Sequence, residues 1–224
     1  STSVNWSDVV NRPVGQTRIK VFQCPSAPRP DRLDGNPDVI QTGGNAAFVA
    51  TANLFTACTD YAATIGVDPR LEAVFTTASG GKEIKAGTGI LPKNQVGTFA
   101  DVTDGLSNTI MLVESAGRPF VYRRGPVLVS NKLDLNRINA GGWVRPASDL
   151  LFSGSNKAGT VIPPTSSADA VALNAANGDD VGGAIYPHPV YGTEGTSQPF
   201  AFHNTGANAL FGDGSVKLID EAVD

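Results

Sequence analysis

Four residues have side chains that could bind a ligand: His203, Asn208 and Asp213 in one C-terminal segment, and Glu114 at the end of an apolar run. Histidine ligates borderline metals, and carboxylates add hard oxygen donors, so the four could hold a metal or another ligand. The alternative is structural, with His203 bonded to a buried carboxylate and Asp213 accepting the amides of its own turn. The sequence favours this alternative, because a single histidine rarely marks a zinc site.

A second group of oxygen donors precedes the apolar run that ends at Glu114. Asp101, Asp104, Ser107 and Asn108 form a polar loop there. Calcium takes six to eight oxygen ligands, and this loop could supply several, so calcium is the cofactor that the sequence suggests. The spacing does not match an EF-hand. The alternative is an Asx-turn in which Ser107 and Asn108 bond to nearby backbone amides.

Other features exclude several classes of function. The chain has no Gly-x-Ser-x-Gly, His-Glu-x-x-His or Walker-type phosphate loop, so we expect a non-enzymatic protein. Its net charge is −4, and no run of basic residues exceeds the pair Arg123-Arg124. A nucleic-acid ligand would need a basic patch, so we expect no nucleic-acid partner.

The strongest local signal is a C-terminal β-hairpin. Two short apolar-rich runs, Ala207–Phe211 and Ser215–Ile219, flank Gly212-Asp213-Gly214. Asp-Gly between such runs is typical of a hairpin, because the turn needs a positive φ that glycine adopts without strain. His203 would then lie at the entrance of the hairpin and Asp213 at its turn.

The remaining elements indicate an α+β protein dominated by antiparallel strands, in one domain over residues 1–224. With 25 glycines and 15 prolines the chain is rich in turns. The run Thr109–Glu114 predicts a strand buried on both faces. Glu114 would need a partner, with His203, Arg118 and Arg145 as alternatives.

Further strands are predicted at Arg18–Phe22, Tyr61–Val67, Phe120–Tyr122, Val127–Val129 and Trp143–Val144. Short helices are predicted at Val4–Asn11, ended by Pro13, and at Ala46–Phe55, whereas Leu71–Thr77 is ambiguous. Residues 153–183 predict a long loop region with at most a short helix near Ala168–Leu173.

Five ordered motifs carry a resemblance to a known family. They are Phe22-Gln23-Cys24-Pro25-Ser26, Asp60-Tyr61-Ala62, Asp104-Gly105-Leu106-Ser107-Asn108-Thr109 followed by Glu114, Gly142-Trp143, and His203 followed after nine residues by Asp213-Gly214. The chain resembles a large bacterial family of pilin-like proteins of unknown function, whose precursors carry a prepilin-type N-terminal segment. It departs from the family pattern at Asn204-Thr205-Gly206, where Pro-Gly-Gly is frequent.

The resemblance implies a pilin-like fold in which a long N-terminal helix lies against a twisted sheet. Residues 1–15 would be a remnant of that helix region, and the missing helix would be the only link to a membrane. The implied function is an extracytoplasmic, inner-membrane-anchored or surface subunit of a type II secretion or type IV pilus-like filament. Its partners would be other pilin-like subunits, with secreted cargo or a glycan as a further ligand.

Two alternatives stay open beside the filament subunit. One is an extracellular module that binds a glycan or small solute in the loops of residues 153–191, beside His203. The other is a metal-dependent hydrolase that uses His203, Asp213 and Glu114.

Cys24 and Cys58 are the only two cysteines of the chain. The extracytoplasmic location that the resemblance implies favours a disulfide between them, since disulfides persist in oxidising compartments. The alternative is a pair of buried free thiols, which are common in protein cores.

Overall fold

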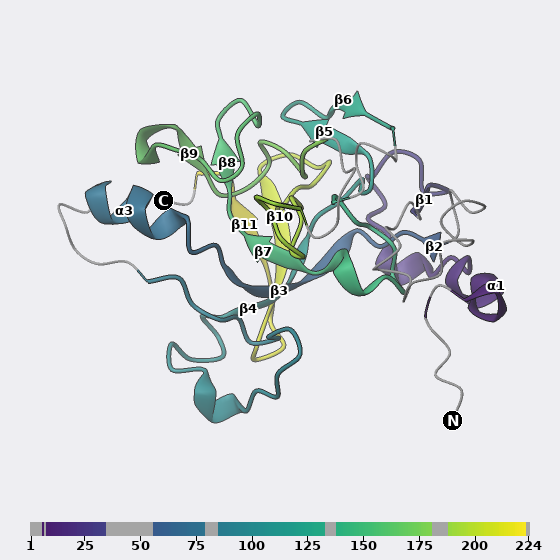
Figure 1. Cartoon of the computed structure of the whole chain (residues 1–224), viewed down its shortest axis with the longest axis horizontal. Helices are drawn as coiled ribbons and strands as arrows, with labels where there is room; N and C mark the ends of the chain where they lie inside the picture. Colours follow the sequence, from purple (N-terminus) through teal and green to yellow (C-terminus); the bar gives the residue numbers. More distant parts are fainter. Residues whose placement is uncertain are drawn as a thin grey trace.

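A five-stranded sheet forms the centre of the computed structural model, which describes residue 6 and residues 8–34, 56–78, 85–132, 138–180 and 188–222 (Figure 1). In spatial order its strands are β11 (Val216–Asp220), β10 (Gly206–Phe211), β4 (Ile110–Glu114), β3 (Tyr61–Val67) and β7 (Leu150–Phe152). Only the β3–β7 pair is parallel. The expected dominance of antiparallel strands is therefore confirmed for this sheet.

One face of the sheet holds the core. Successive residues of β3 alternate between half-buried and buried, as in a strand that packs one face inward. The buried side chains are Ala62, Val113, Leu150, Ala209 and Phe211. The opposite face is only partly covered, and the predicted burial of β4 on both faces is wrong, because its first three residues are half-buried.

The predicted C-terminal hairpin is confirmed. β10 and β11 pair antiparallel, and the turn between them contains Gly214 with a φ of 85°. Asp213 Oδ1 accepts a hydrogen bond of 2.9 Å from the backbone N of Ser215. The turn therefore uses Asp213 as a local acceptor, as the structural alternative predicts.

Three two-stranded sheets surround the centre. They pair β1 (Leu33–Asp34) with β2 (Thr56–Ala57), β5 (Val121–Arg123) with β6 (Val127–Ser130), and β8 (Ser155–Asn156) with β9 (Ala170–Val171). The α-helices among the described residues include α1 (Arg12–Gly15) and α3 (Leu71–Ala78), which lie at opposite ends of the molecule (Figure 1). Short 3-10 helices cover Val9–Asn11, Lys20–Phe22, Phe99–Asp101, Pro146–Ser148 and Ser167–Asp169.

Several predictions about local structure are wrong. The helical segment near the N-terminus continues through Pro13, because proline is tolerated in the first turn of a helix. Residues 18–22 end in a 3-10 helix rather than a strand, and the predicted helix near Ala168–Leu173 is instead the 3-10 helix Ser167–Asp169 followed by β9. The predicted helix at Ala46–Phe55 lies outside the described residues.

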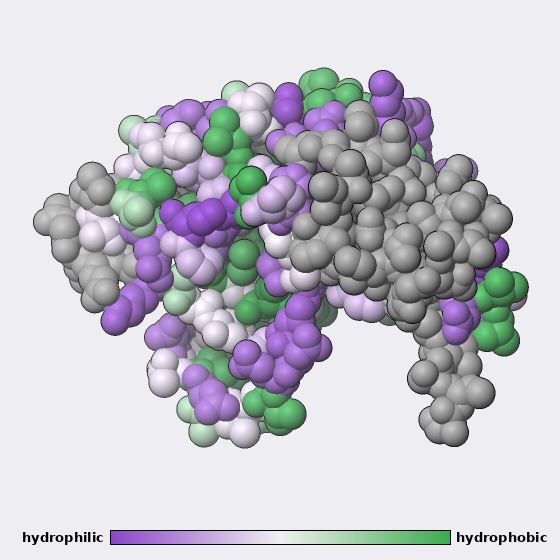
Figure 2. Space-filling view, in the orientation of Figure 1, coloured by the Kyte–Doolittle hydropathy of each residue, from purple (hydrophilic) through white to green (hydrophobic). Residues whose placement is uncertain are grey.

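Apolar side chains are also exposed away from the sheet. They gather over α1 and over the β5–β6 hairpin (Figure 2), where Val127, Leu128 and Val129 are 57%, 38% and 38% exposed. Among the described residues, no helix combines the length and the apolar character needed to cross a membrane.

Candidate functional site

Glu114 and His203 form the centre of a polar cluster at one end of the central sheet. His203 Nε2 lies 2.9 Å from Glu114 Oε2, which confirms their predicted pairing. The same oxygen accepts hydrogen bonds from the backbone N of Asn208 at 3.1 Å and from its Nδ2 at 3.0 Å. Glu114 is completely buried, whereas the His203 side chain is 29% exposed. The cluster therefore connects a buried carboxylate to the surface.

Cys24 completes this cluster. One donor atom from each of Cys24, Glu114 and His203 lies within 4.8 Å of the other two. Burial, and then the adjacent Glu114 carboxylate, raise the pKa of the Cys24 thiol to about 12. A thiol with such a pKa stays protonated at neutral pH and is a poor nucleophile. In the present structure Cys24 is therefore a neutral thiol beside the Glu114 carboxylate.

Strand register explains how residues so distant in sequence meet. Ala209 of β10 pairs with Val113 of β4, so their neighbours Asn208 and Glu114 lie side by side on the adjacent row. His203 belongs to the short loop that leads into β10. Two paired strands thus supply Glu114 and Asn208, and the loop before β10 supplies His203.

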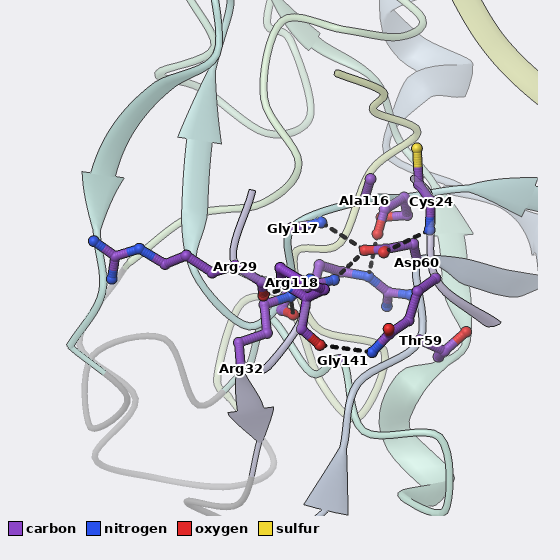
Figure 3. A network of polar contacts seen from close by, with 12 residues as sticks. Cys24, Arg29, Arg32, Thr59, Asp60, Ala116, Gly117, Arg118 and Gly141 are labelled. Carbon is purple, nitrogen blue, oxygen red and sulfur yellow. Dashed lines mark hydrogen bonds and ion pairs between the residues drawn. The ribbon is translucent and has the colours of Figure 1, made fainter. Parts of the chain in front are cut away.

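Cys24 is positioned by a buried ionic network around Asp60. Asp60 directly precedes β3, and its Oδ2 accepts a hydrogen bond of 2.9 Å from the backbone N of Cys24. Its Oδ1 accepts a hydrogen bond of 2.8 Å from the backbone N of Gly117 and also forms an ion pair with Arg32 (Figure 3). Both charged side chains of the pair are fully buried. Asp60 therefore fixes the N-terminal segment to the sheet.

Arg118 extends the network to the loop that follows residue 138. Its Nε donates to the Ser115 carbonyl at 2.9 Å, and its Nη1 donates to the Ala140 carbonyl at 2.6 Å. Burial of the whole side chain lowers the pKa of Arg118 to about 10. The backbone carbonyl of Arg118 accepts a hydrogen bond of 2.6 Å from Arg32 Nε. Through its guanidinium and its backbone carbonyl, Arg118 therefore ties three separate segments together.

A second buried ion pair explains the Gly-Trp motif. Asp34 Oδ2 accepts the backbone amides of Gly141 and Gly142 at 2.8 and 2.9 Å, and both oxygens lie 3.0 Å from Arg145 Nη1. A Cβ on Gly142 would lie 2.3 Å from Thr56 Cγ2. Glycine is therefore required for this close approach.

The other predicted ligands lie apart from this cluster, around the hairpin turn. Asp213 N donates to the Leu106 carbonyl at 3.2 Å, and Lys217 Nζ donates to the Ser107 carbonyl at 2.9 Å. Asp213 is thus separated from His203, with which it was grouped, because β10 lies between them.

Two of the four residues proposed for calcium, Asp101 and Asn108, make local side-chain contacts. Asp101 Oδ2 accepts hydrogen bonds from the backbone N and Oγ1 of Thr98, in a capping box that lowers the pKa of Asp101. Asn108 Nδ2 donates to the Asp104 carbonyl at 2.9 Å. These contacts support the turn interpretation, and calcium binding stays a prediction.

The predicted disulfide is not formed, since Cys24 and Cys58 are both free and buried. The sulfur of Cys24 points away from Asp60 (Figure 3) and towards the Glu114 cluster. The backbone of Cys58 forms an isolated antiparallel β-bridge with Gly142. Burial, more than the nearby charges of Arg32 and Asp34, determines the raised pKa of its thiol. The two thiols therefore lie in different surroundings, Cys24 beside Glu114 and His203 and Cys58 near Arg32 and Asp34.

A separate cavity of about 710 Å³ lies beside α3 and β9. Its apolar lining includes Leu71, Phe75 and Phe152, and its polar lining includes Asp68 and Lys157. Part of this lining comes from the loop region where a solute site was predicted. His203, expected beside that site, does not line the cavity.

Sequence reasoning missed Cys24 as a neighbour of Glu114 and His203, and missed Arg32 and Asp60 as the groups that position it. The available signal was their place in the motifs, since Cys24 and Asp60 each belong to one of the five. In the structure, one residue from each of the five motifs lies in the two ionic networks or in the Glu114 cluster. These residues are Cys24, Asp60, Glu114, Gly142 and His203.

Comparison with known proteins assigns the chain to a family. No curated protein and no solved structure matches the chain. A family model described as "Protein of unknown function (DUF1559)" matches residues 1–224. The chain therefore belongs to the DUF1559 family of proteins of unknown function.

Proposed function

We propose that the chain is the globular part of a non-enzymatic, extracytoplasmic pilin-like subunit. In this proposal an apolar helix precedes Ser1, packs along the sheet and joins the subunit to a type II secretion or type IV pilus-like filament. The observation that carries it is the partly covered apolar face of the central sheet. The covering element is taken to be a prepilin-type N-terminal helix because the five motifs resemble those of pilin-like proteins.

The face is built from side chains that strand register places in rows. One row crosses the sheet through Ala63, Leu112, Leu210 and Val216. Val216 is 67% exposed and Leu218, in the next row, is 50% exposed. An apolar surface of this kind, on a sheet whose other face already holds the core, is typical of an interaction site. A helix of matching apolar character would cover it.

The test uses the full-length protein expressed with its assembly machinery. Val216→Asp and Leu218→Asp place charges on the sheet face, and Val127→Asp is the matched control, because Val127 is 57% exposed on the separate β5–β6 hairpin. We expect the two face variants to be lost from purified filaments and the control to be retained. Retention of all three variants, or a wild-type protein that never enters filaments or the membrane, would overturn the proposal.

The cavity beside α3 supports a second candidate, a module that binds a small solute. Its volume of about 710 Å³ lies within the range of ligand pockets, which are mostly apolar with a few polar groups. We expect a thermal-shift screen of solutes and short glycans to yield a ligand whose effect is weakened by Lys157→Ala. Lys132→Ala, outside the cavity lining, is the control. A screen without a ligand would remove this candidate.

A further inference from the structure

The Glu114 cluster contains three different metal-binding donors in one place. They are the thiol of Cys24, the carboxylate of Glu114 and the imidazole of His203. They come from the segment before the sheet, from the end of β4 and from the loop before β10, so the fold rather than local sequence brings them together. The donor atoms all lie within 4.8 Å of one another.

One oxygen of Glu114 is left for a further partner. Oε2 accepts the hydrogen bonds from Asn208 and His203, whereas Oε1 is buried and accepts no hydrogen bond from the described residues. A buried carboxylate oxygen without a partner is costly. Asn208 meanwhile orients the carboxylate through its backbone and side-chain N–H groups, as outer-shell groups do at metal sites.

We propose that Cys24, Glu114 and His203 bind a single Zn²⁺ ion. Zinc accepts this mixture of sulfur, oxygen and nitrogen, at bond lengths of about 2.0–2.3 Å. Those lengths place tetrahedral ligand atoms roughly 3.3–3.8 Å apart, so shifts of about an ångström from the present positions suffice. On binding, the thiol proton of Cys24 passes to solvent. The Nε2 proton of His203 also leaves, and the neutral ring carries its proton on Nδ1 instead, so that Nε2 is free to bind the metal and the direct His203–Glu114 hydrogen bond is replaced.

The fourth ligand would come from outside this set of side chains. His203 is 29% exposed while Glu114 is fully buried, so the site opens to solvent on the histidine side. Three protein ligands with one position left for water or a substrate group are the pattern of zinc sites that bind small molecules. This proposal rests on the donor atoms of the cluster and not on the filament role, although Asn208 pairs with Leu218 of the sheet face.

The test is cobalt and zinc titration of the purified, tag-free chain. Co²⁺ bound by a thiolate gives a charge-transfer absorption band in the near ultraviolet, which reports directly on Cys24. We expect one Co²⁺ per chain, displaced by Zn²⁺, and a rise in Tm of about 5–10 °C when Zn²⁺ is at 100 times its Kd. Cys24→Ser should abolish the band, and His203→Gln should weaken binding at least about tenfold.

The chain offers a matched control for each ligand type, because it has two cysteines and two histidines. Cys58→Ala removes the other thiol, and His188→Gln removes a histidine whose Nδ1 accepts local backbone amides. Both controls should keep the cobalt band and the affinity. A cobalt spectrum without the thiolate band, or binding retained by His203→Gln and lost in His188→Gln, would overturn the proposal. If Cys24→Ser does not fold, His203→Gln still tests the proposal. His203 is partly exposed, so we expect this variant to fold.

Discussion

His203 Nε2 lies 2.9 Å from Glu114 Oε2, although the two residues are 89 positions apart in the sequence. Asp213, which shares a sequence motif with His203, lies at the opposite end of β10. The strand has six residues, which span about 20 Å at 3.4 Å each. The nine residues between His203 and Asp213 are therefore enough to run from one end of β10 to the other. His203 and Asp213 consequently contact different partners at the two ends of the strand.

This geometry predicts energetic coupling between His203 and Glu114 but not between Asp213 and Glu114. In a double-mutant cycle, Glu114→Gln and His203→Ala should show a coupling energy of about 0.5–3 kcal/mol, because they share a hydrogen bond. Asp213→Ala combined with Glu114→Gln should be additive within about 0.5 kcal/mol. Urea unfolding of the single and double variants measures both values, and equal coupling in the two cycles would contradict the separation.

Asp60→Asn should destabilise the protein strongly. The substitution leaves the guanidinium of Arg32 buried without its counter-charge, and breaking such a pair costs about 3–5 kcal/mol. Thermal unfolding should show a Tm lower by about 6–20 °C for a chain of this size. Asp31→Asn, one residue before Arg32 but exposed, should stay within about 0.5 kcal/mol of wild type. Equal effects of the two substitutions would contradict the role given to Asp60.

The two thiols should be free and unreactive in the native chain. Burial raises the pKa of both, to about 12 for Cys24, so little thiolate exists at pH 8. An aromatic disulfide reagent should titrate two thiols per chain after denaturation without reductant, and should react more than about 100-fold more slowly with the native chain. An intact mass lower by two hydrogens would instead reveal a disulfide.

Asp68 should make the protein sensitive to acid. Burial alone would raise its pKa, but hydrogen bonds from Arg70 and from Ser153 Oγ lower it below the ordinary value of 3.8. A carboxyl group with a lowered folded pKa stabilises the protein above the unfolded pKa, and that stability is lost as the pH falls through the folded pKa. Asp68→Asn should therefore show less loss of Tm below pH 4 than the wild type.

The control for this measurement is Asp31→Asn. Its Tm should fall with decreasing pH as that of the wild type does, because Asp31 is exposed. If Asp68→Asn and wild type lose stability in parallel between pH 4 and pH 2, other groups determine the acid response.

Local signals predicted the elements whose partners are close in sequence. Tyr61–Val67 was correct to the residue, and its Tyr, Thr, Ile and Val are residues that favour strands. The hairpin was correct because the turn itself requires glycine at position 214. Residues 18–22 alternate polar and apolar residues and were also predicted as a strand, but they end in a 3-10 helix whose Phe22 carbonyl accepts a hydrogen bond of 2.7 Å from Asp60 N. Alternation is therefore not sufficient to identify a strand.

The site was predictable in part. Glu114, Asn208 and His203 were identified from their chemistry, and the structure brings them together. Cys24 was assigned to a disulfide instead, because nothing in the sequence specifies which way its sulfur points. That direction depends on the contact between Cys24 N and Asp60, 36 residues away, and such long-range contacts leave no local periodicity.

The Asp60 network also has a consequence for how the protein folds. Its members come from residues 24–32, from residue 60 and from residues 115–118, and Arg118 extends it to residue 140. No fragment that lacks one of these segments can complete the network, and loop closure over such separations is slow. The network is therefore complete only after all of these segments have met. Because the proposed metal ligands Cys24, Glu114 and His203 span a similar range of the chain, the thiolate-to-cobalt band would report that step of folding in real time.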